Sequence, residues 1–375
     1  MPTVGPAFDV PTAGTIAIGL LAVALILLIV AGGIRHFLAP FLAFGHYVYA
    51  RTLQNPADKL RNRRLRMFSE YLESRLYNLE VKELWRDRRF VELEAEVEIE
   101  SHEGSVVRRE SSLSVALTQS RGRLILLLGE PGTGKTVTLR HAAHSMLRRV
   151  KTSPRLDVVI PVYVDLSLWK PIGQPSAKAL EEYVLLSMRR AADRDVDHFL
   201  DEEFQRLLTQ GSWVFLLDSF DSIPAIRTSG APSDVVEEYA NAVYTFAYGL
   251  HACRTVLASR PIELMYRPLK SLQFTILALT ERRKREFLRR ADLPTAVRDS
   301  LEKALDASEP LLQKFLERPI FMEMWCSYAR ERLIMLTSAH QLLRTHLQPR
   351  LEGSTQYSTN DSAILTQGYE GYLRI

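Results

Sequence analysis

A glycine-rich run followed by a lysine and a threonine is the stretch best suited to chemistry. It comprises Gly129, Glu130, Pro131, Gly132, Thr133, Gly134, Lys135 and Thr136. Glycines let main-chain N–H groups point inward around an anion, and a helix N-terminus adds partial positive charge. In such a loop the lysine reaches the β- and γ-phosphates of a nucleotide, and the threonine hydroxyl binds Mg²⁺. These residue types and their order predict a phosphate-binding loop.

The segments on either side of this loop support the prediction. The run 124–128 is wholly apolar and reads as a buried strand, and apolar residues recur at helical spacing over 137–150. Strand, glycine-rich turn, Lys-Thr and helix is the context that a phosphate-binding loop requires, which a chance glycine-rich turn would lack. We therefore expect the chain to bind a nucleoside triphosphate.

Three polar residues at strand ends are candidates for the remaining chemistry. Asp218 ends the apolar run 213–217, where an acid lies at the ligand-binding edge of an open α/β sheet and can act on the metal side. Asp221 could orient or deprotonate the attacking water, although a surface aspartate in a turn is the simpler interpretation. Arg260 ends another apolar run, 255–258, and could contact the γ-phosphate or point into solvent.

The order of these motifs resembles that of the NACHT group of signal-transducing (STAND) NTPases. The matches are the loop 129–136, the acid motif 216–221 and the strand end 259–261. Further on, 277–282 resembles the family's entry into a helical subdomain, and 318–326 resembles a motif whose proline touches adenine. The resemblance covers about 113–328 and implies bound ATP and Mg²⁺, with Pro319 on the adenine side.

The chain departs from the family pattern at two points. Ser222 stands where the family usually has a glutamate after the second acid, so we expect slow hydrolysis. Family members usually continue into a winged-helix domain and a repeat sensor, for which there is little room after residue 328. We expect either a minimal member or a piece of a longer protein.

Apolar runs alternating with helical patterns predict an α/β fold, a P-loop NTPase parallel sheet with helices on both faces and a small helical subdomain after it. Within the chain of 375 residues, a strand is expected over 89–100, with a hairpin to 106–109. The expected divisions are an N-terminal tail with a transmembrane helix (1–35), a basic juxtamembrane region with a short β segment (36–111), the NTPase domain (112–279), the helical subdomain (280–335) and a tail (336–375).

The N-terminal region predicts a membrane anchor. Residues 10–34 contain no charged side chain and would span roughly 37 Å as a helix, enough to cross a bilayer. Arginines and lysines follow this segment rather than precede it, which predicts a single pass with the N-terminus outside and the NTPase domain in the cytoplasm. A buried helix or an uncleaved signal is the alternative, and a second crossing over 37–49 would reverse the topology.

The amino-acid composition limits the kinds of protein and of binding partner to be considered. A hydrophobic fraction of 46% with 25% charged residues excludes disorder throughout. The two cysteines, Cys253 and Cys326, lack metal-ligand spacing and read as reduced core residues. Much of the net charge of +4 comes from basic residues shortly after the anchor, which suit membrane lipid better than nucleic acid.

We therefore expect a membrane-anchored ATP-dependent switch that changes between closed and self-associating states, with an unknown protein partner. The alternative is a scaffold that holds ATP without hydrolysing it. A GTPase is disfavoured because the chain has no N/T-K-x-D motif for reading guanine, and a small-molecule kinase is disfavoured because no substrate lid is identifiable.

Overall fold

The computed structural model describes residues 56–82, 87–101, 104–152, 159–189, 194–229, 234–249, 253–262 and 272–332. The chain divides into two units, Met1–Arg61 and Asn62–Ile375. The expected membrane segment 10–34, the apolar stretch 37–49 and the tail 336–375 lie outside the described residues. Within those residues, no helix has both the length and the apolar character needed to cross a membrane.

Five parallel strands form the core of the sheet. They are β3 (Leu124–Leu128), β4 (Ile160–Asp165), β5 (Trp213–Asp218), β6 (Arg254–Ser259) and β7 (Leu272–Ile276), in the spatial order β7-β3-β6-β5-β4. All the residues of β3 and β5 are buried, as expected for strands covered on both faces. Strand β6 lies between the strand that precedes the phosphate loop and the strand that ends in Asp218.

An antiparallel hairpin extends the sheet beyond β7. Strands β1 (Ala95–Ser101) and β2 (Gly104–Glu110) pair with each other, and β1 also pairs antiparallel with β7. The sheet is therefore mixed rather than parallel throughout, and the hairpin expected before the NTPase domain is part of its sheet. The strand expected over 89–100 begins only at Ala95, the residue opposite Ile276 at the end of β7. Before it, Asp87–Arg89 forms the 3-10 helix η1.

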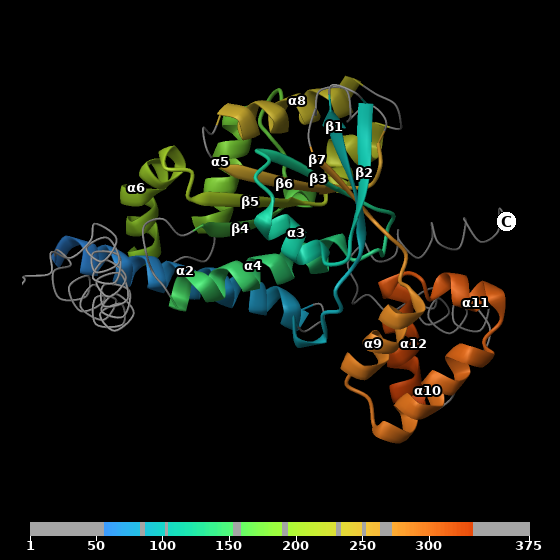
Figure 1. The fold of residues 1–375 in the computed structure, drawn as a ribbon. Coiled ribbons are helices and arrows are strands. Elements are labelled where there is room, and N and C mark those ends of the chain that lie inside the picture. Colours follow the sequence, from blue (N-terminus) through green and yellow to red (C-terminus); the bar gives the residue numbers. More distant parts are fainter. Residues whose placement is uncertain are drawn as a thin grey trace, which may run out of the picture. The chain divides into compact units, whose positions relative to one another are not determined.

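Helices cover both faces of the sheet (Figure 1). One face carries α3 (Leu113–Gln119) and α4 (Lys135–Thr152), and the other carries α5 (Ala177–Arg189) and α8 (Asp234–Gly249). Helix α4 buries the apolar residues predicted from its periodicity, Leu139, Ala143, Met146, Leu147 and Val150.

Helix α2 (Pro56–Lys82) packs on α4 and on α6 (Arg194–Thr209). Its buried Glu80 carboxylate lies 2.6 Å from His144 Nε2 of α4. Its Phe68 ring stacks on that of Phe199 in α6, with 4.7 Å between the centroids. The buried apolar side chains of α2, which include Leu65, Phe68 and Leu72, attach this helix to the domain.

Short elements follow β4 and β5, and four helices follow β7. The short elements are η2 (Leu166–Leu168), η3 (Phe220–Ser222) and α7 (Pro224–Ser229). The four helices are α9 (Glu281–Arg290), α10 (Thr295–Ala307), α11 (Pro310–Phe315) and α12 (Pro319–Arg332). Thr280 caps α9, because its hydroxyl oxygen accepts a hydrogen bond from the N–H of Arg283. The side chains of Leu301, Leu312 and Trp325 in these helices are buried. Helices were expected in this part of the chain, and their division into a separate subdomain stays a prediction.

Candidate nucleotide-binding site

The glycine-rich run forms a tight loop between β3 and α4. Gly132 and Gly134 have positive φ angles of 79° and 96°, which side chains other than glycine rarely adopt. The Gly129 N–H donates to the carbonyl of Ser259, so the loop is attached to the end of β6. Helix α4 begins at Lys135, so the last two residues of the run form its N-terminus, where free N–H groups favour an anion.

The Lys135 ammonium group closes this loop. Its Nζ donates to the carbonyls of Gly129, at 2.6 Å, and Glu130, at 3.1 Å. Burial lowers the pKa of Lys135, and the charges of Asp221 and Asp218 partly oppose that shift. The side chain thus lies on the loop itself, facing both acids that the sequence singled out.

Asp218 lies at the carboxyl end of β5, 1% exposed. The Thr136 hydroxyl hydrogen-bonds to its carboxylate, as does that of Tyr163, and the N–H of Ser219 donates to Oδ1 at 2.9 Å. Burial raises the pKa of Asp218, while the hydrogen bonds from Thr136 and Tyr163 and the Arg140 charge act against that rise. The structure therefore brings together both residues predicted on the metal side.

Tyr163 and Arg140 belong to this cluster and were missed by the sequence reasoning. The Tyr163 hydroxyl donates to Asp218 Oδ2 at 2.8 Å, and Arg140 Nη2 donates to the Tyr163 oxygen at 3.2 Å. Tyr163 is hidden in the apolar run that forms β4, and Arg140 interrupts the apolar face of α4. An arginine on the apolar face of the second turn of this helix was the available signal.

Asp221 and Arg260 form an ion pair at the same edge of the sheet. Asp221 Oδ2 accepts from Arg260 Nε at 2.7 Å, and Oδ1 accepts from the Arg260 main-chain N–H at 3.1 Å. Between the two acids, Ser219 has φ 63°, the one positive value of a non-glycine residue in the described part of the chain. This left-handed residue turns the chain after β5, so that η3 carries Asp221 back toward β6.

The N-terminus of α12 packs directly on the phosphate loop. The N–H of Ile320 donates to the carbonyl of Gly132 at 3.3 Å. A Cβ atom at Gly132 would lie 2.4 Å from Cγ2 of Ile320, and one at Gly134 would lie 3.7 Å from Cγ of Pro319. The structure thus places Pro319 beside the loop, and it adds Ile320, which the sequence did not reveal.

The donors at the site fit Mg²⁺ held together with a nucleotide. A carboxylate (Asp218) and a hydroxyl (Thr136) supply oxygen atoms, which this ion prefers, and Mg²⁺ usually takes its other ligands from phosphates and water. No cluster of three or more metal-binding His, Cys, Asp or Glu side chains occurs among the described residues. The carbonyl of Ser259 accepts from the Gly129 N–H, and the buried hydroxyl of the same residue has no hydrogen-bond partner.

Comparisons with known proteins return structures but no sequence relatives. No family model and no curated protein match the chain. Three similar structures are a Walker-type ATPase of Pyrococcus abyssi, the ORC2 protein of Aeropyrum pernix and DnaA of Aquifex aeolicus. The identities are 14%, 14% and 15% and the TM-scores 0.40, 0.40 and 0.31. The matches cover 64%, 66% and 63% of this chain, and 72%, 69% and 62% of the three structures.

The fold is that of a P-loop NTPase. Because the TM-scores are low, this assignment depends on the chain's own features: the strand order, the glycine loop before α4, and the buried acid that ends β5. The P-loop is hereafter the segment 129–136. The roles given to Asp218, Asp221, Arg260 and Pro319 remain predictions.

Proposed function

We propose that the chain is an ATP-controlled switch of the NACHT/STAND type, in which the state of the P-loop determines the position of α12. The observation that carries this proposal is the contact between Ile320 and Gly132. A switch requires that a ligand interact differently with two arrangements of the protein. Here the element that would bind the phosphates and the helix that would move are in direct contact.

Binding of ATP with Mg²⁺ follows from the chemistry of the P-loop. Lys135 would exchange the carbonyls of Gly129 and Glu130 for the β- and γ-phosphates, which are stronger acceptors. Mg²⁺, when bound, neutralises charge on the phosphate oxygens. Thr136 and Asp218 would hold it from the protein side, and Pro319 would lie beside the adenine.

Slow hydrolysis is the second part of the proposal. Each oxygen of the Asp221 carboxylate accepts a hydrogen bond from Arg260, so fewer acceptor positions are left to orient or deprotonate a water while that pair is intact. Ser222, which follows Asp221, offers no second carboxylate. An enzyme of this kind would stay in its ATP-bound state for long periods, as a switch requires.

A scaffold that binds ATP without hydrolysing it is the second candidate function, and the same Asp221–Arg260 pair favours it. The two candidates differ only in turnover. Release of phosphate by purified protein, abolished by Asp221→Asn, would support the switch and rule out the scaffold.

Calorimetry tests the shared requirement for nucleotide binding. ATP with Mg²⁺ is titrated into the full chain in detergent and into two variants, Lys135→Ala and Lys151→Ala. Lys151 lies at the other end of α4, where it pairs with Glu73 at 2.6 Å, and serves as the matched control. We expect Lys135→Ala to weaken binding at least a hundredfold and Lys151→Ala to leave it unchanged. Equal affinities in all three proteins would overturn the proposal.

We further propose that residues 10–34 anchor the chain in a membrane, with the NTPase domain in the cytoplasm and available for self-association. The uncharged sequence of this segment and the basic residues after it support the proposal. Full-length protein should stay in the membrane fraction after alkaline carbonate washing, whereas a chain that starts at residue 51 should not. Release of the full-length chain by carbonate would contradict this.

A further inference from the structure

The carboxylate of Asp218 is held by protein donors at both of its oxygens. The Tyr163 hydroxyl donates to Oδ2 at 2.8 Å, and the Ser219 N–H donates to Oδ1 at 2.9 Å. Tyr163 comes from β4, the strand next to β5, and the two strands pair in parallel with Tyr163 opposite Leu216. The phenol therefore reaches Asp218 from a neighbouring strand, whereas Thr136 reaches it from helix α4.

Arg140 fixes the direction of the Tyr163 hydroxyl proton. The guanidinium carbon lies 5.0 Å from the centroid of the Tyr163 ring, and Nη2 donates to the phenol oxygen at 3.2 Å. Arginine has only donors and an ionised carboxylate only acceptors. The phenol oxygen must therefore accept from Arg140 and give its own proton to Asp218.

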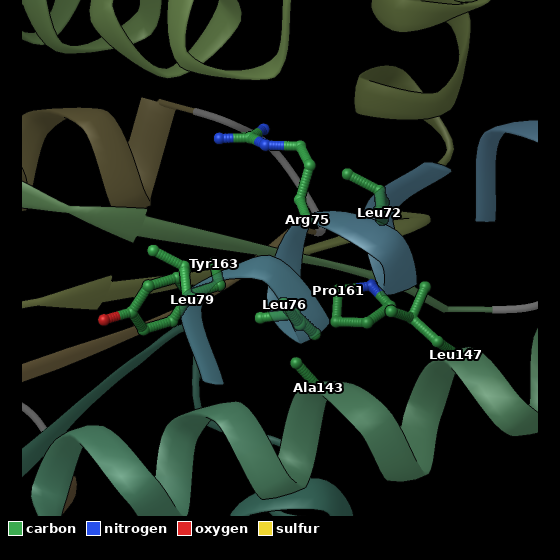
Figure 2. Close-up of a pocket in the computed structure, with 8 residues that line it drawn as sticks. All are labelled: Leu72, Arg75, Leu76, Leu79, Ala143, Leu147, Pro161 and Tyr163. Atoms are coloured by element: carbon green, nitrogen blue, oxygen red, sulfur yellow. The ribbon is translucent and has the colours of Figure 1, made fainter. Parts of the chain in front are cut away.

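Packing holds the Tyr163 ring independently of its hydroxyl. The ring lines a small cavity together with Leu76 and Leu79 of α2 and Ala143 of α4 (Figure 2). The volume of this cavity, about 20 Å³, admits about one water molecule and no larger ligand. The cavity is therefore a packing feature rather than a binding site, and removing the hydroxyl would leave the ring supported.

We infer that Tyr163 is a positioning residue: its hydroxyl holds Asp218 in the orientation in which that carboxylate, with Thr136, binds the Mg²⁺ that accompanies the nucleotide. The inference depends on the proposed nucleotide binding and adds a residue to that site. Hydrogen bonds to a metal-binding carboxylate from the surrounding protein commonly change metal affinity by about tenfold or more when removed.

The test compares Tyr163→Phe with a matched control, Tyr183→Phe. The Tyr183 hydroxyl donates to the main-chain carbonyl of Asp165, also in β4, at 2.6 Å. Each variant therefore removes a hydroxyl that binds the same sheet region, but only Tyr163 binds Asp218. The affinity for a fluorescent ATP analogue is measured on the full chain, first in EDTA and then at increasing Mg²⁺, with thermal unfolding as the check on folding.

We expect Tyr163→Phe to raise the Mg²⁺ concentration for half-maximal enhancement of nucleotide binding about tenfold and to leave the affinity in EDTA unchanged. Tyr183→Phe should change neither quantity. In an Asp218→Asn background, Tyr163→Phe should have no further effect on the Mg²⁺ dependence, because it acts through that carboxylate.

The outcomes separate this inference from the proposed function. If the unmutated chain binds no nucleotide, the proposed function fails and this inference fails with it. If it binds nucleotide with Mg²⁺ dependence and Tyr163→Phe leaves that dependence unchanged, only the inference is overturned. An equal loss of affinity with and without Mg²⁺ also overturns it, because that result shows a merely structural role.

Discussion

Asp221 binds both the main-chain N–H and the Nε of Arg260, so one carboxylate fixes the position and the direction of the arginine at the end of β6. The Asp221 side chain is 11% exposed and that of Arg260 34% exposed, which places the pair at the rim of the site. Asp221 is thus a partner that helps to position the Arg260 guanidinium at this rim.

Asp221→Ala should therefore reduce ATP turnover at least tenfold while changing ATP affinity less than threefold. The reason is that the Asp221 carboxylate accepts its two hydrogen bonds from Arg260, whereas it acts on Lys135 of the P-loop through charge alone, so its loss should disturb the γ-phosphate end more than phosphate binding. Steady-state phosphate release and calorimetry give the two quantities. Asp201→Ala, which breaks an exposed ion pair with Arg189, is the control. A large loss of affinity with turnover per bound ATP intact would contradict this assignment.

Gly132→Ala should destabilise the protein more than Gly173→Ala. Both glycines have similar positive φ angles, 79° and 82°, so both variants carry the same backbone cost of about 1 kcal/mol. Only at Gly132 would the new Cβ meet Ile320, whereas at Gly173 nothing lies within 4 Å. We expect an additional loss of about 1–3 kcal/mol in the free energy of unfolding, measured with urea.

Adding Ile320→Ala to the Gly132→Ala variant should recover part of that additional loss, because it removes the atom that clashes. Equal destabilisation by Gly132→Ala and Gly173→Ala would show that α12 does not rest on the P-loop.

Pro319→Ala should weaken binding of ATP about threefold to tenfold and leave binding of inorganic tripolyphosphate unchanged. The proposed contact of Pro319 is with the adenine, and tripolyphosphate has no base; losing apolar contact of this size costs about 1 kcal/mol. Pro310→Ala, at the start of α11, is the matched control, since it also changes the first residue of a helix in the same subdomain. An equal loss for both ligands would place Pro319 on the phosphate side instead.

Acid should weaken the fold through Asp87. Burial by itself raises the pKa of this carboxyl, but the hydrogen bond from His141 and the charges of His141, His144 and Arg148 outweigh it, so the pKa lies below the ordinary 3.8. A lowered pKa in the folded state gives stability that is present above pH 3.8 and is lost as the pH falls through the folded value.

The free energy of unfolding should therefore decrease from about pH 4 downward, and Asp87→Asn should reduce that decrease. At neutral pH the same substitution should cost about 1 kcal/mol. Urea unfolding over a pH series measures both effects, with the exposed Asp299→Asn as control. An unchanged slope in Asp87→Asn would show that another group controls the acid response.

Local chemistry made the P-loop predictable from sequence, whereas the contacts around it were not. Positive φ at Gly132 and Gly134 follows from the residue type and the motif. The contact of Tyr163 with Asp218 requires β4 to lie next to β5, and the contact of Ile320 with Gly132 joins segments nearly 190 residues apart. The residue spacing within a single segment predicts neither of these two contacts.

The number of strands in the sheet could likewise not be predicted from local sequence patterns. The residues of β1 and β2 alternate as a hairpin should, which the sequence indicated correctly. The hairpin joins the sheet because β1 pairs with β7, a strand that lies far downstream in the sequence. This pairing depends on which edge of the parallel core is left open. The hairpin was recognised, but its place in the NTPase sheet was not.

The pairing of β1 with β7 has a practical consequence for producing the protein in pieces. A fragment that begins at residue 112, where the NTPase domain was expected to start, would keep every predicted phosphate ligand but leave the main-chain groups of β7 without their antiparallel neighbour. A bare strand of that kind recruits strands from other molecules and promotes aggregation. Expression boundaries should therefore retain the hairpin, even where only the ATP chemistry is of interest.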